Sequence, residues 1–176
     1  SQIAQAAKKS LTKQGLDIRM SCRVTGTTVT ETGVLVTYQD SNGESSLEVD
    51  KLIVAVGRRP NTEGLGAAEV GLTLDDGGRI VVDEHCRTNM DGVYAIGDVV
   101  TGPMLAHKAS EEGIAVAEMI AGQSAHIDHS IVPWVIYTHP EIAWVGKTEE
   151  EVKDSGEPYK TGAVPFAANG RALAAG

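Results

Sequence analysis

The chain has 176 residues, of which 41% are hydrophobic, and a formal net charge of −9. This length suggests one or two domains with a core, and no apolar run is long enough to span a bilayer. The negative charge argues against nonspecific binding to nucleic acid. We therefore expect neither nucleic acid nor a membrane as a partner. Cys22 and Cys86 fit no Cys-x-x-Cys pattern, and we expect reduced thiols in a cytosolic setting.

The first fifth of the chain is predicted to form a helix and a strand. Ile3, Ala7 and Leu11 recur at helical spacing, which predicts a helix over residues 2–14 that ends at Gly15. A strand is expected to follow over residues 16–24.

A hairpin and a buried strand are predicted next. Residues 34–39 and 47–52 form its two arms, joined at the Asn42–Gly43 turn, because Asn-Gly supports positive φ. The continuous apolar run 52–56 predicts a strand covered on both faces, as in an α/β sheet.

The middle of the chain contains turn signals and one further apolar run. Residues 60–66 are rich in Pro, Asn and Gly and are a candidate domain boundary, and residues 75–78 predict a turn between the segments 72–74 and 79–82. Residues 93–96 predict a buried strand bounded by Gly92 and Gly97. A helix is expected over residues 104–120, with Ile114, Ala117 and Ile120 on one face.

These elements predict one binding site. The 93–96 strand leaves Asp98 at its carboxyl end, directly after Gly97 and shortly before a helix N-terminus. A carboxylate accepts hydrogen bonds from hydroxyls, and the free N–H groups of a first helical turn favour an anionic or electron-rich group. A flavin dinucleotide meets both demands. The plainer alternative is a buried strand leading to a core helix, with Asp98 as a turn former.

The C-terminal part changes in composition from residue 132. Strands are predicted over residues 134–137, 142–145 and 159–165. Thr148 and Glu151 have the spacing of a capping box, and Gly156 is expected to end that helix. The histidines lack a recognisable ligand set, so we predict no metal site at His85–Cys86 or at His126, Asp128 and His129.

Several motifs resemble one enzyme family. Residues 88–98 (TNMDGVYAIGD) are similar to the second flavin motif of the pyridine-nucleotide disulfide oxidoreductases. Residues 102–109 (GPMLAHKA), followed by Glu112–Gly113, resemble its dihydrolipoamide dehydrogenase branch in particular. Residues 57–61, 137–147 and 165–169 are similar to further motifs of the same family.

The resemblance implies an α/β fold: partial FAD/NAD(P)-binding Rossmann-like domains followed by the start of an α+β dimerisation domain. The expected parts are the end of an NAD-binding domain (1–60), the returning part of an FAD-binding domain (61–128) and the beginning of the interface domain (129–176).

The resemblance also implies roles for individual residues. Asp98 would hold the ribityl hydroxyls of FAD, and Gly57 would touch the nicotinamide cofactor, NAD. Val24 aligns with an adenine-side NAD contact, although a core valine fits its position equally well. Arg58 and Arg59 fit either a phosphate contact or an exposed ion pair. The helix start near the flavin ring is formed by the backbone of four residues: Met104, Leu105, Ala106 and His107.

The implied parent enzyme oxidises protein-bound dihydrolipoamide with FAD and NAD. It would be a homodimer that serves the lipoyl domains of 2-oxoacid dehydrogenase complexes or the glycine cleavage system, in the cytoplasm or, in a eukaryote, the mitochondrial matrix. NADP stays open as an alternative to NAD, because the sequence lacks the residue that discriminates them.

The sequence also lacks the family's redox-active cysteine pair, its His–Glu base pair and any Gly-x-Gly-x-x-Gly fingerprint. We therefore expect a fragment without catalytic residues. Two alternatives remain: another flavin disulfide reductase, of the glutathione or mercuric reductase type, and a noncatalytic binding or dimerisation module.

Overall fold

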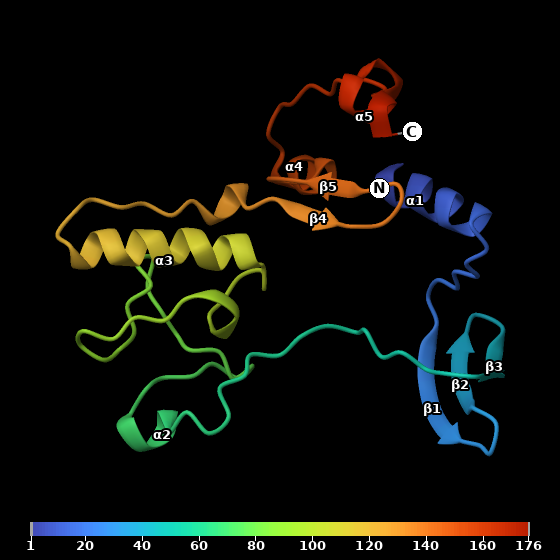
Figure 1. The fold of residues 1–176 in the computed structure, drawn as a ribbon, viewed down its shortest axis with the longest axis horizontal. Coiled ribbons are helices and arrows are strands. Elements are labelled where there is room, and N and C mark those ends of the chain that lie inside the picture. Colours follow the sequence, from blue (N-terminus) through green and yellow to red (C-terminus); the bar gives the residue numbers. More distant parts are fainter. Residues whose placement is uncertain (1, 176) are drawn as a thin grey trace.

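The computed structural model describes residues 2–175. Figure 1 shows an open arrangement, with an N-terminal sheet on one side and a long helix on the other. The longer elements are α1 (Gln2–Lys13), β1 (Arg23–Val29), β2 (Val34–Asp40), β3 (Gly43–Val49), α3 (Ala106–Ile120) and α4 (Glu149–Ser155). The shorter ones are α2 (Ala67–Val70), η1 (Gly97–Val99), η2 (His129–Ile131), β4 (Trp134–Ile136), β5 (Ile142–Trp144), η3 (Phe166–Ala168) and α5 (Gly170–Ala175).

The N-terminal helix and hairpin agree with the prediction. Helix α1 begins and ends within one residue of the expected bounds. Strands β1, β2 and β3 form an antiparallel sheet in that order. Strand β3 ends at Val49, three residues before the predicted end of its arm. The turn lies at Ser41–Asn42, and Asp40 is paired with Gly43.

Three predicted strands are wrong in this structure. Residues 16–22 are irregular, so that β1 begins only at Arg23, and residues 52–56 and 159–165 form no strand. The side chains of Ile53 and Val56 are 86% and 93% exposed. A strand covered on both faces needs neighbouring strands and covering helices. Among residues 2–175, no segment pairs with residues 52–56, and their apolar side chains lie open.

The central part is a small core built from turns. Ile80, Ala95 and Val100 are buried against Leu72, Val82 and Val99. The predicted turn at 75–78 is confirmed, since the Asp75 N–H donates to the Arg79 carbonyl at 2.8 Å. The predicted strand over 93–96 is reduced to the isolated bridge between Arg87 and Tyr94, next to which the Thr88 N–H donates to the Val93 carbonyl and the Ala95 N–H to the Cys86 carbonyl.

Helix α3 is confirmed, but its start and its buried face differ from the prediction. It begins at Ala106, because Leu105 is extended. Ile114 and Ile120 are exposed rather than buried. The buried face contains two charged residues and two small apolar ones: Lys108, Glu112, Ala115 and Val116.

The C-terminal part contains the antiparallel pair β4–β5, on which Trp134 and Trp144 stack with ring centroids 5.5 Å apart. The predicted capping box between Thr148 and Glu151 is present at the start of α4, and Gly156 ends that helix. Within residues 2–175, none of the helices combines the length and the apolar character needed to cross a bilayer.

Candidate functional site

The Gly97–Asp98 turn lies directly against α3. Residues Gly97–Val99 form the short helix η1, and Gly97 has φ +76°. A Cβ atom at position 97 would lie 3.2 Å from the Cβ of Ala109, on the second turn of α3. Glycine is therefore needed at this position both for its positive φ and for the close approach of the turn to the helix.

A buried ion pair holds the Gly97 backbone from both sides. The Nζ of Lys108 lies 2.8 Å from the Oε1 of Glu112, and both side chains are 1% exposed. The Gly97 N–H donates to the Oε2 of Glu112 at 2.7 Å. Lys108 donates to the Gly97 carbonyl at 3.2 Å. The pair on α3 thus satisfies both polar groups of the residue before Asp98.

The Asp98 side chain points out of the core and is 47% exposed. Its Oδ2 lies 3.9 Å from the Nη2 of Arg58. Within residues 2–175 the Asp98 carboxylate accepts no direct hydrogen bond, and this long ion pair is its one charged contact. An exposed ion pair of this kind contributes about 0–1 kcal/mol. Asp98 is therefore available to accept hydrogen bonds from hydroxyl groups of a ligand.

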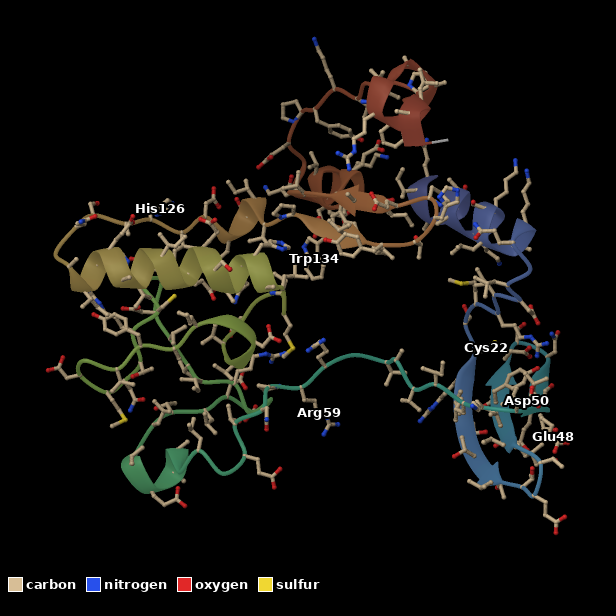
Figure 2. All side chains as sticks on the ribbon, in the orientation of Figure 1. Cys22, Glu48, Asp50, Arg59, His126 and Trp134 are labelled. Carbon is tan, nitrogen blue, oxygen red and sulfur yellow. The ribbon has the colours of Figure 1, made fainter. Side chains whose placement is uncertain are left out.

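The beginning of α3 presents free backbone N–H groups. Its N-cap, Leu105, makes no side-chain capping bond, and the first turn contains no acidic residue. The Nε2 of His107 lies 2.7 Å from the carbonyl oxygen of Pro133. In the tautomer with a proton on Nε2, His107 donates a hydrogen bond to this carbonyl. In Figure 2, Trp134, the next residue, lies beside this end of α3. The end of α3 is held in place while its positive pole stays uncapped.

Gly57 and Val24 lie apart from Asp98. Val24 is on β1, opposite Tyr38, and is 57% exposed. Gly57 has φ +132° and lies on the extended segment between the sheet and the central part, which Figure 2 marks at Arg59. Figure 1 shows β1 and α3 on opposite sides of the molecule. Gly57 and Val24 are a second group of predicted site residues only through their expected role, and Arg58, the neighbour of Gly57, contacts Asp98.

The sequence analysis missed the roles of Lys108, Glu112 and His129. His129, on η2, places its Nε2 2.9 Å from the Oε1 of Glu112. A Lys and a Glu at i and i+4 normally indicate a solvated helix face. The available signal was their position on the same face as Ala115 and Val116, which a helical projection shows.

No group of three His, Cys, Asp or Glu in residues 2–175 is arranged to hold a metal ion. Asp128 accepts from the backbone and hydroxyl of Ser130, which hold the pKa of its carboxyl below the usual value. Cys22 and Cys86 are free. Burial raises the pKa of the Cys86 thiol, and the nearby Glu112 carboxylate adds to this effect.

Comparison with known families gives two matches. Residues 1–113 match the pyridine nucleotide-disulphide oxidoreductase family, and residues 132–176 match the dimerisation domain of the same family. The sequence is similar to the dihydrolipoyl dehydrogenase of Cupriavidus necator, with 58% identity over 99% of the chain. It is also 47% identical, over 97% of the chain, to the mitochondrial dihydrolipoyl dehydrogenase of Caenorhabditis elegans. The chain spans only 37% and 35% of the length of these relatives.

Solved structures have a similar arrangement of their parts. The structure of LpdA from Mycobacterium tuberculosis is 30% identical, with a TM-score of 0.85 over 98% of this chain and 37% of its own. The HOCl-induced flavoprotein disulfide reductase RclA from Escherichia coli is 29% identical, with a TM-score of 0.86 over 99% of this chain and 40% of its own. The open arrangement in Figure 1 thus resembles the placement of the same segments in much longer chains.

Proposed function

Because this chain belongs to the pyridine nucleotide-disulphide oxidoreductase family, we propose that a complete subunit containing it is a dihydrolipoyl dehydrogenase. That enzyme would oxidise protein-bound dihydrolipoamide with FAD and NAD. The observation that carries the proposal is the half-exposed Asp98 carboxylate, which directly follows the Gly97 turn packed on Ala109 in the N-terminal part of α3, a helix with no side-chain cap. The names of the Cupriavidus necator and Caenorhabditis elegans relatives favour this activity over a glutathione or mercuric reductase.

The described residues fit one end of a flavin. Asp98 offers an acceptor with no direct hydrogen bond within residues 2–175, which suits the hydroxyls of a ribityl chain. In the stretch from Met104 to His107, the Leu105 N–H donates to the Pro103 carbonyl, while the first N–H groups of α3, from Ala106 on, have no capping side chain and suit the electron-rich edge of the ring. No Gly-x-Gly-x-x-Gly loop occurs in the sequence, so the pyrophosphate would be bound by other parts of the subunit.

When bound, the flavin carries two electrons from the dithiol to the nicotinamide cofactor. In the overall reaction the dithiol loses two electrons and two protons, NAD+ accepts a hydride, and one proton is released. The positive pole of α3 would stabilise negative charge on the reduced ring by about 0.3–2 kcal/mol. Asp98 would fix the orientation of the ring through the sugar alcohol, and the redox cysteines would come from outside this chain.

The second group of residues would bind the nicotinamide cofactor. Gly57 has positive φ and no neighbouring heavy atom within 4 Å of a Cβ position, so a ligand edge could lie directly against its backbone. Val24 is exposed on β1, which supports an adenine-side contact over a place in the core. Arg58 links the two groups through Asp98.

The proposed division of the chain is residues 1–60 for the NAD-binding part, 61–128 for the FAD-binding part and 129–176 for the interface part. The match of residues 132–176 to a dimerisation domain supports a homodimer. Protein partners would be the lipoyl domains of 2-oxoacid dehydrogenase complexes or of the glycine cleavage system. The proposed compartment is the cytoplasm or the mitochondrial matrix.

The proposal is tested with the complete subunit, purified and analysed for bound flavin and for electron transfer to NAD+. We expect one FAD per subunit and NAD+-dependent oxidation of dihydrolipoamide. Glutathione disulfide with NADPH and mercuric ion with NADPH serve as competing substrate pairs. A yellow protein that reduces either of these, and does not oxidise dihydrolipoamide, would show that the assigned substrate is wrong.

A further inference from the structure

We propose that Lys108, Glu112 and His129 form a positioning network, which fixes the Gly97–Asp98 turn in the geometry needed for flavin binding. The network further links this turn to the segment that leads into the dimerisation part. This inference rests on the proposed function, since it assigns the network a role at the same flavin site.

The geometry around Gly97 indicates a positioning role for the Lys108–Glu112 pair. Its N–H and its carbonyl are both bound by side chains of α3, through Glu112 at 2.7 Å and Lys108 at 3.2 Å. Two hydrogen bonds on one residue fix the plane of both adjoining peptides. The fixed peptide between Gly97 and Asp98 places the backbone nitrogen and the Cα of Asp98, from which its side chain extends.

The burial of the ion pair points to the same role. Lys108 and Glu112 are each 1% exposed, and removing such charges from water has a large cost. Well-packed apolar side chains are often as stable as a buried ion pair, so stability alone is a poor reason for the pair. What apolar side chains cannot provide is a donor and an acceptor for Gly97. The pair therefore has a function in specifying the conformation of the turn.

His129 joins the ion pair to η2. His129 binds the same Glu112 oxygen that pairs with Lys108, while the other Glu112 oxygen accepts the Gly97 N–H. His129 lies three residues before the segment that matches the dimerisation domain. The connection from residue 129 to Asp98 thus passes through one carboxylate. A change in the position of η2 would move Glu112 and, with it, the turn that carries Asp98.

The test uses the complete subunit, stripped of flavin, and measures the dissociation constant for FAD and the visible circular dichroism of the bound flavin. The main variant is the double substitution Lys108→Met/Glu112→Leu, which keeps the core filled but removes both partners of Gly97. We expect a dissociation constant at least about tenfold higher, from two lost hydrogen bonds, and an altered flavin spectrum. The apo-protein should still unfold cooperatively.

A second set of variants avoids the core. His129→Ala should raise the dissociation constant for FAD about threefold to tenfold, through one lost charge-assisted bond. His129→Gln, which keeps a donor, should restore most of the affinity. His126→Ala is the matched control, since Figure 2 shows His126 on the exposed loop that runs back along α3. It should bind FAD as the wild type does.

The outcomes separate the two proposals. If the wild-type subunit binds no FAD, both the proposed function and the network fail. If the wild type binds FAD and the double and His129 variants match it in affinity and spectrum, the network is overturned while the flavin assignment stands. If the double variant does not fold, the His129→Ala and His129→Gln pair decides.

Discussion

Glu112 accepts the backbone N–H of Gly97 through its Oε2 at 2.7 Å, although the two residues are 15 positions apart in the sequence. This bond lies in the interior, where a hydrogen bond to a charged group contributes about 1.5–3 kcal/mol. It joins the middle of α3 to the turn that carries Asp98. The candidate flavin site therefore depends mainly on the packing of a turn against a helix. It depends less on the regular strand that the sequence predicts over residues 93–96.

Gly97→Ala should destabilise the protein and weaken flavin binding. The new Cβ would lie 3.2 Å from the Cβ of Ala109 and would force alanine to adopt φ +76°. The left-handed conformation alone costs about 1–2 kcal/mol for such a residue. The free energy of unfolding, from urea titration of the complete subunit, should fall by about 2 kcal/mol.

The matched control for this substitution is Gly162→Ala. Gly162 is exposed, and a Cβ there meets no heavy atom within 4 Å. The free energy of unfolding of the Gly162→Ala variant should stay within about 0.5 kcal/mol of the wild-type value. Equal stability of the two variants would contradict the close packing of Gly97 on α3.

The 176-residue chain by itself should aggregate and should lack NADH-dependent diaphorase activity. Ile53, Val54 and Val56 are all exposed on the segment predicted to be a covered strand. Unpaired apolar segments of this kind bind one another. Sedimentation and binding of a hydrophobic dye would measure the effect, and Ile53→Lys/Val56→Lys should reduce both. A monomeric wild-type chain that turns over NADH would refute this expectation.

Cys86 should be inert towards thiol reagents in the folded protein. It is 1% exposed, and burial raises the pKa of its thiol, so the reactive thiolate is scarce near neutral pH. Cys22 is partly exposed and serves as the internal comparison. Mass spectrometry after labelling should find Cys86 modified only in denaturant. Equal labelling of both cysteines in the native protein would show that the core around Ala95 is open.

Asp75 should make the free energy of unfolding depend on pH in the acidic range. The backbone N–H of Arg79 lowers the pKa of this carboxyl below its ordinary value of 3.8, and the N–H of Gly77 adds to the effect. Because the pKa is lower in the folded state, the stabilisation is present above pH 3.8 and disappears as the pH falls through the folded value. We would measure the free energy of unfolding in urea at pH 6 and at pH 3. It should decrease less between these two pH values for Asp75→Asn than for the wild type. The control is Asp76→Asn, a substitution of an exposed neighbour, which should behave as the wild type. If the free energy of unfolding of Asp75→Asn decreases between pH 6 and pH 3 as much as that of the wild type, Asp75 is not the group responsible.

Local sequence signals predicted the elements that depend on near neighbours. The capping box of Thr148 and Glu151, the end of α4 at Gly156 and the hairpin turn before Gly43 each need only a few adjacent residues. Helices α1 and α3 followed from their periodicity. The residues 52–56 were assigned to a strand on their apolar character alone, and the described chain contains no neighbouring strand to pair with them.

The site was predictable only in part, for a related reason. Gly97, Asp98 and the following helix are close in sequence, so their arrangement could be inferred from turn and helix signals. The contacts of Glu112 with Gly97 and with His129 depend on which face of α3 is buried. The apolar residues Ile114 and Ile120 indicated the opposite face, and they are exposed here.

The most direct test of the account is the affinity of the complete, flavin-free subunit for FAD in wild type, Asp98→Ala and Asp76→Ala. Asp98 is the half-exposed acceptor that follows the Gly97 turn packed on α3, and losing its proposed hydrogen bonds to the ribityl chain should weaken binding at least about tenfold. Asp76→Ala should bind as the wild type does. Equal affinity and stoichiometry for all three proteins would contradict the assignment of Asp98 to the flavin.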